Sequence, residues 1–124
     1  MKIVRKEDVS PINNAEGELF YEMIGRGEKL GNSEHHSLGH VVVKKGFSTN
    51  KHYHPIAEET YYFIRGTGRM VINEKEYIVK SGDAVLINPM DIHQLFAENE
   101  EVEAIVVCAP AFEINNTVFC DMEG

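Results

Sequence analysis

The sequence predicts an all-β protein, a sandwich or barrel with few or no helices, and three observations lead to this prediction. Ten glycines and four prolines recur at short intervals along the 124 residues. Between them lie short runs rich in β-branched and aromatic residues, which is typical of sandwiches and barrels. Helical signal is poor, because the best candidate segment, residues 14–18, is interrupted by Gly17.

Several of these runs have the composition expected of strands. In chain order they cover residues 38–43, 60–64, 70–72, 77–79, 84–87, 93–96 and 102–108. Residues 73–76 separate the third run from the fourth and predict a hairpin turn. Residues 80–83 come before the fifth run and contain Gly82, which supplies the backbone angles of a tight turn.

Composition excludes several classes of protein. Hydrophobic residues make up 43% of the chain and charged residues 26%, which suits one domain with its own core. The net charge of −8 repels a phosphate backbone. No apolar run approaches the ~20 residues of a membrane span, and no apolar stretch of a secretory signal follows the start. Two cysteines are too few for a disulfide scaffold. We therefore predict a reduced, cytoplasmic protein with neither a nucleic-acid nor a membrane partner.

The placement of the histidines is the main functional signal. His52 and His54 are two residues apart, so on a strand their imidazoles share a face and can converge on one metal. Pro55 lets the chain turn, which can return the carboxylate of Glu59 to the same centre. His93, at the start of a later run, is the fourth candidate ligand. Three imidazoles and a carboxylate suit Mn, Fe, Ni, Co, Zn or Cu, and ligand type alone does not choose among these metals.

A known signature contains the first three of these ligands. The spacing resembles, residue for residue, the first signature of the cupin superfamily: Gly46, five residues, His52, one residue, His54, four residues, Glu59, six residues, Gly66. The second cupin signature is met at Gly82 and His93. It is not met at three other positions, where proline, glycine and asparagine are usual: Asn88, Met90 and Ala97.

The resemblance implies a double-stranded β-helix, a jelly-roll barrel with one divalent transition metal inside one end. It implies ligand roles for His52, His54, Glu59 and His93, and Glu58 is the alternative carboxylate because shorter spacing also occurs among cupins. The barrel core is expected at residues 37–110. An N-terminal strand and loop segment at 1–36 and a C-terminal strand or tail at 111–124 complete one domain.

Two functions are compatible with this resemblance. The first is a metal-dependent enzyme of dioxygenase, decarboxylase or isomerase type, acting on a small polar or carboxylated molecule. The alternative is a non-catalytic module that binds or senses a sugar or acid through its metal. A polar acid or base group beside the metal favours the enzyme, whereas a wholly apolar wall favours the binding module.

His40 and Tyr61 are the candidate catalytic residues. His40 lies in the first predicted strand, where it either lines the pocket as an acid, base or substrate contact or faces outward. Tyr61 shares the inward face of Glu59 and Phe63, as a pocket wall or a catalytic acid.

The remaining polar candidates have simpler interpretations. We expect His35 and His36 to be solvated in a polar loop. Arg26 and Arg65 are either surface residues or partners of an anionic substrate, and Cys108 is expected to be a small core residue.

The run 102–107 is apolar on both alternating faces. A strand of this kind is buried on both sides, which predicts a homodimer. Residues 19–24 are the candidate for pairing across it.

Overall fold

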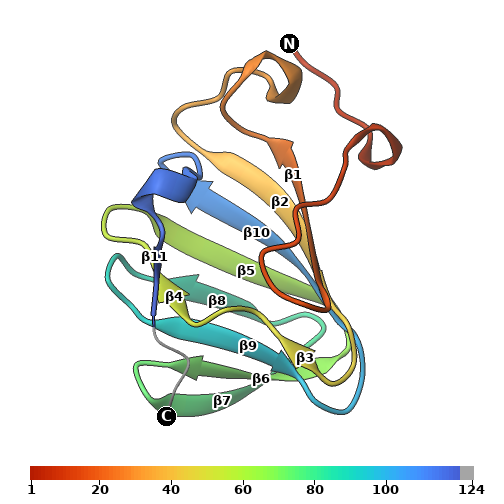
Figure 1. Cartoon of the computed structure of the whole chain (residues 1–124), viewed down its shortest axis with the longest axis vertical. Helices are drawn as coiled ribbons and strands as arrows, with labels where there is room; N and C mark the ends of the chain where they lie inside the picture. The colour runs from red at the N-terminus through yellow and green to blue at the C-terminus, as the bar shows by residue number, and fades with distance from the viewer. Residues whose placement is uncertain (121–124) are drawn as a thin grey trace.

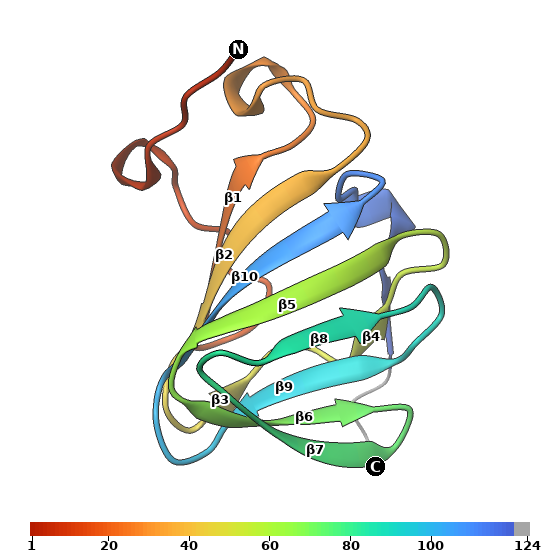
Figure 2. The ribbon, with the colours of Figure 1, turned by 180° about the vertical axis from the view of Figure 1, so that it is seen from behind.

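The computed structural model describes residues 1–120, and it confirms the all-β prediction with two antiparallel sheets. The first sheet consists, in spatial order, of β1 (Glu18–Ile24), β2 (Ser37–Val43), β10 (Val102–Ala109), β5 (Glu58–Arg65) and β8 (Ala84–Ile87). Figure 2 shows these strands side by side in one layer.

The second sheet faces the first (Figure 1). It consists, in spatial order, of β11 (Val118–Phe119), β4 (His52–Tyr53), β9 (His93–Ala97), β6 (Thr67–Ile72) and β7 (Lys75–Lys80), with β3 (Phe47–Ser48) also paired to β9. Each predicted run lies within one strand, from β2 to β10. Helical structure in residues 1–120 is limited to 3-10 turns at Lys6–Asp8, Glu28–Leu30 and Ile114–Asn116, and no helix there is long and apolar enough to cross a membrane.

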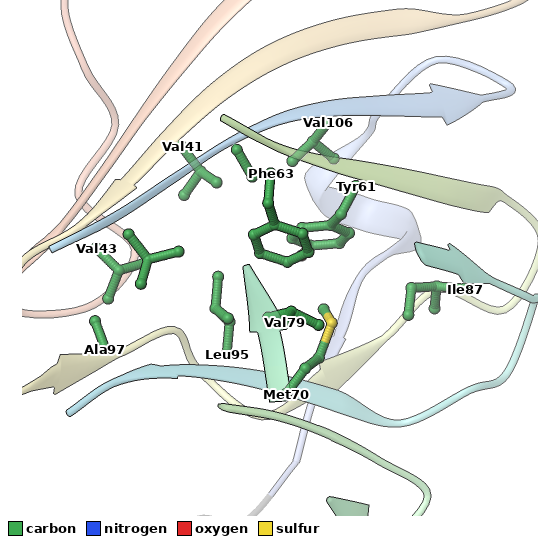
Figure 3. Close-up of a cluster of buried hydrophobic side chains, with 12 residues drawn as sticks. Val41, Val43, Tyr61, Phe63, Met70, Val79, Ile87, Leu95, Ala97 and Val106 are labelled. Atoms are coloured by element: carbon green, nitrogen blue, oxygen red, sulfur yellow. The ribbon is translucent and has the colours of Figure 1, made fainter. Parts of the chain in front are cut away.

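Alternation along the strands builds the core between the sheets. In β5, Tyr61 and Phe63 point inward and are 4% and 0% exposed, whereas Tyr62 on the other face is 49% exposed. Met70 and Leu95 meet them from the opposite sheet, and both are fully buried (Figure 3). Burying each of these large side chains stabilises the fold by about 1.5–3 kcal/mol, so the core fixes which face of each strand points inward.

The predicted hairpin joins β6 to β7. Asn73 and Glu74 have φ values of 48° and 71°, the left-handed pair that a two-residue hairpin turn requires. Gly66, the last residue of the first cupin signature, has a φ of 82°. A Cβ atom there would overlap the backbone carbonyl oxygen of Glu101, so only glycine fits.

The terminal segments cover the two ends of this arrangement. Residues 19–24 lie in β1, which pairs with β2 of the same chain, and Ile12 forms an isolated bridge to Phe20. The C-terminal segment leaves β10 in one sheet and joins β4 of the other through β11 (Figure 1). Of the expected tail at 111–124, residues 121–124 lie outside the described part. The crossing brings the C-terminal segment beside His52 and His54.

Candidate metal centre

The structure brings the four predicted ligands together between the sheets. His52 and His93 are register partners on β4 and β9, His54 follows β4, and Glu59 comes from β5 of the opposite sheet. One ligand atom from each side chain lies within 4.8 Å of all the others. Ligands on opposite sides of a metal at ~2.1 Å are ~4.2 Å apart, so a contraction of only a few tenths of an ångström completes a site. The alternative carboxylate, Glu58, is exposed on the outer face of β5.

Two of the imidazoles are oriented by backbone carbonyls outside the cluster. The Nδ1 atom of His52 lies 2.7 Å from the carbonyl oxygen of Asn50, and that of His93 lies 2.9 Å from the carbonyl oxygen of Asp91. A carbonyl only accepts, so both Nδ1 atoms carry the proton. The Nε2 atoms then face the centre, which is the usual arrangement of metal-binding histidines, and that of His93 lies 3.0 Å from Glu59 Oε1, in a hydrogen-bond contact that a bound metal would replace.

The third imidazole is oriented by the C-terminal segment. The Thr117 hydroxyl donates to the backbone carbonyl of Glu113 at 3.1 Å, so it accepts from His54 Nδ1 at 3.2 Å. His54 Nε2 is buried and lies 3.4 Å from Glu59 Oε2, but it has no hydrogen-bond partner among residues 1–120. An unpaired, buried imidazole nitrogen that faces three other ligand atoms fits a metal ion.

The charges of the cluster also suit a cation. Burial by itself would raise the pKa of Glu59, but His54 and His93 beside its carboxylate outweigh burial and lower that pKa well below its usual value. Burial, and then the neighbouring His93, lower the pKa of His52 to about 4. Near neutral pH Glu59 is therefore anionic and His52 neutral, the protonation states in which both bind metals.

The loop of the second cupin signature is tied to the first. Met90 occupies the position where glycine is usual, and its φ of 73° is the left-handed conformation that glycine adopts freely. Its backbone N–H donates to the carbonyl oxygen of His54 at 2.9 Å. Met90 therefore keeps the turn that glycine usually forms, although it departs from the signature, and this turn leads into His93.

A small cavity of about 60 Å³ adjoins the cluster. On this measure it has room for on the order of four water molecules. None of the described residues that line it is Lys or Arg; the lining residues are Asn14, Glu18, Phe20, Ser37, Val41, Thr49, Asn50, His52, His54, Glu59, Tyr61, Val106, Cys108, Phe112, Thr117 and Phe119. The cavity is therefore acidic and partly aromatic.

Of the two candidate catalytic residues, only Tyr61 faces this cavity. Its ring centroid lies 6.1 Å from that of His93, and burial and then Glu59 raise its pKa well above the usual value, so its hydroxyl stays protonated. His40, which we named as a candidate catalytic residue, takes the outward one of its two predicted positions and does not line the cavity. Val41 and Val43 point inward from β2, so alternation turns His40 to the outer face, where its Nε2 lies 3.3 Å from Glu103.

The other sequence candidates lie outside the cavity. His35 and His36 are exposed. Arg26 pairs with Glu113 at 3.3 Å, and Arg65 pairs with Glu101 and Glu103 on the surface.

Sequence reasoning missed three residues that contact the cluster or the cavity. Cys108 is buried as expected, but its Sγ lies 3.7 Å from Glu59 Oε2. Glu18 and Thr117 lie outside the predicted core at 37–110, and nothing in their local sequence points to the centre. Only the pairing of β1 with β2 and of β11 with β4 brings them there.

Comparison with known proteins agrees with this fold. Residues 39–110 match the family described as Cupin domain. The uncharacterized protein MJ1618 of Methanocaldococcus jannaschii is 30% identical over 97 residues, which cover 77% of this chain and 76% of that protein.

A Streptomyces PAC13 variant with uridine has a TM-score of 0.80 at 16% identity, covering 100% of this chain and 94% of that chain. The polyketide cyclase RemF from Streptomyces resistomycificus has a TM-score of 0.79 at 19% identity, covering 99% and 87%. Because the family match spans more than half of the chain, this protein belongs to the cupin domain family.

Proposed function

We propose that this protein is a metal-dependent enzyme that acts on a small polar molecule, with His52, His54, Glu59 and His93 holding one divalent transition metal. The observation that carries the proposal is the orientation of the imidazoles: their Nδ1 atoms are engaged outside the cluster, and the Nε2 atoms of His54 and His93 lie 3.4 and 3.0 Å from the Glu59 carboxylate. A metal bound there would supply Lewis-acid or redox chemistry.

The groups around the cluster support an enzyme over a passive binding module. Tyr61 presents a protonated hydroxyl, and Glu18 presents a second carboxyl group to the same cavity. Groups that hold or move protons beside a metal are what catalysis requires. Among the structural neighbours, PAC13 is described as a nucleoside dehydratase and RemF as a polyketide cyclase, so this fold supports enzymes acting on small molecules.

The first test is elemental analysis of the purified protein. We expect about one transition-metal ion per chain, and a His52→Ala/His54→Ala variant should lose it while its circular dichroism remains that of a β protein. The matched control is His35→Ala/His36→Ala, which removes two exposed histidines outside the cluster. Wild-type protein without metal, or equal loss in both double variants, would contradict the proposed centre.

The second test separates an enzyme from a binding module. Metal-loaded protein is incubated with a panel of small alcohols, sugars and acids, and substrate loss and oxygen consumption are followed. Turnover that disappears in the His52→Ala/His54→Ala variant supports the enzyme. A compound that binds the loaded protein, with no member of the panel converted, supports the binding module instead.

A further inference from the structure

A second carboxylate faces the cavity without a partner. Glu18 is the first residue of β1, and its side chain lines the same cavity as His52 and His54. The residue is only 7% exposed. Its Oε1 atom is buried and makes no hydrogen bond to any of residues 1–120. The cavity therefore contains an acceptor atom that the protein itself leaves unsatisfied.

An unsatisfied buried oxygen of this kind is rare. Buried polar groups in folded proteins are nearly always hydrogen-bonded, and the exceptions are concentrated at functional sites. Burial, and then the charge of Glu59, raise the pKa of Glu18 to about 7. A buried carboxyl group without a hydrogen-bond partner destabilises the fold, so the presence of Glu18 points to a ligand that binds in the cavity.

The rest of the cavity restricts the chemistry of that partner. Glu18 and Glu59 are both acidic, and no Lys or Arg among the described lining residues would offset an anionic ligand. The cavity of about 60 Å³ limits the ligand to a small molecule. Phe20 and Phe112 form an aromatic wall with ring centroids 5.9 Å apart, against which an apolar portion can pack. A neutral hydroxyl donor suits these surroundings better than a carboxylate.

We propose that Glu18 is the ligand-recognition residue of this cavity, accepting a hydrogen bond from a hydroxyl group of a neutral small molecule. The aromatic wall of Phe20 and Phe112 contacts the apolar part of the same molecule. This inference rests on the proposed function for the place of the ligand beside the metal centre, and it narrows the substrate class to hydroxyl-bearing molecules.

The test compares two probes that share one ring, benzyl alcohol and benzoate. Their dissociation constants are measured by NMR titration at pH 8, with metal-free and with Zn²⁺-loaded protein. We expect metal-free wild type to bind benzyl alcohol at least about tenfold more tightly than benzoate. Glu18→Gln, which keeps the shape of the side chain, should reduce this ratio at least about fivefold.

The matched control is Glu22→Gln. Glu22 lies two residues along β1, and burial raises its pKa too, but it does not line the cavity. This variant should keep the wild-type ratio. The inference is overturned if Glu18→Gln keeps the ratio, if both variants lose it equally, or if wild type does not bind benzyl alcohol at millimolar concentration.

The two kinds of failure are distinguishable. A protein that takes up no Zn²⁺ contradicts the proposed metal centre, but its metal-free titration still tests Glu18. Conversely, the Zn²⁺-loaded protein could prefer benzyl alcohol while the metal-free protein does not. The preference would then come from the metal, and that result would overturn the role of Glu18.

Discussion

Two glutamates in one cavity behave in opposite ways because their neighbours differ. Glu59 lies between His54 and His93, which lower its pKa despite burial, whereas burial, and then the charge of Glu59, raise the pKa of Glu18 to about 7. One carboxylate is thereby ready to bind a cation, and the other is ready to exchange a proton near neutral pH. Divergent pKa values in one site are typical of groups with separate roles.

The raised pKa of Glu18 predicts a pH-dependent stability. A folded-state pKa above the unfolded value favours the protonated fold, so this contribution is complete below about pH 4.5 and is lost as pH rises through about 7. Glu18→Gln should therefore stabilise metal-free protein by on the order of 2–3 kcal/mol at pH 8 and have little effect at pH 4.5. Urea unfolding at both pH values measures this difference, and an equal effect at the two would contradict it.

Met90 predicts a stabilising substitution. Its left-handed backbone costs a non-glycine residue about 1–2 kcal/mol, and its side chain is 58% exposed, so little packing is lost on truncation. After the larger chain entropy of glycine is subtracted, Met90→Gly should stabilise the fold by about 0.5–1 kcal/mol, a rise of a few degrees in Tm. Met90→Ala keeps the Cβ atom and should show no rise in thermal melting. A Tm for Met90→Gly at or below that of Met90→Ala would argue against strain at this position.

At the scale of elements, the C-terminal segment is part of the centre rather than an appendage. It links the two sheets through β11 and contributes Phe112, Thr117 and Phe119 to the cavity lining. Phe112 contacts the ring of His54 at a centroid distance of 6.4 Å, and Phe119 is the register partner of His52. The candidate ligands His52 and His54 are thus supported from outside the region that matches the family.

This support predicts that Thr117 controls metal affinity. Thr117→Val keeps the shape of the side chain but removes the acceptor that orients His54, so affinity for Zn²⁺ should fall on the order of tenfold in competition with a chelator. Thr117→Ser retains the hydroxyl and should stay close to wild type. Equal affinities in the valine and serine variants would show that the hydroxyl does not position the imidazole.

At the scale of the whole molecule, the outer face of the five-stranded sheet carries an apolar patch on β5, β8 and β10. Tyr62, Ile64, Leu86 and Val107 are between 36% and 55% exposed. The register pairs Val107 with Thr60 and Thr60 with Leu86, which places these side chains on neighbouring strands of one surface. Contiguous exposed apolar surface of this kind marks an interaction site.

We propose that this face forms the homodimer interface that the run 102–107 predicted. Light scattering at micromolar concentration should give twice the 14.0 kDa of the chain, and Tyr62→Glu/Leu86→Glu should give the monomer. Ile78→Glu changes a 72% exposed residue of β7 in the other sheet and should leave the dimer intact. A monomeric wild type would rule this interface out.

Local spacing explains most of what could be predicted. Strand positions, the hairpin at residues 73–76 and the inward face of Glu59 and Tyr61 follow from alternation and turn chemistry, which act over a few residues. His40 shows the limit of this reasoning, because alternation alone does not say which face of an isolated strand meets the core. That choice depends on the opposite sheet, whose Met70 and Leu95 belong to the same core as Val41 and Val43 of β2.

The sequence by itself determined most of the strands, the signature and the four candidate ligands, since each depends on local spacing in the chain. Only the tertiary structure decided that Glu18 and Thr117 belong to the same centre. Glu18 lines the same cavity as Glu59, 41 residues along the chain, and Thr117 contacts His54, 63 residues before it. Contacts over such separations are set by how the sheets pair and pack, and no local pattern encodes them.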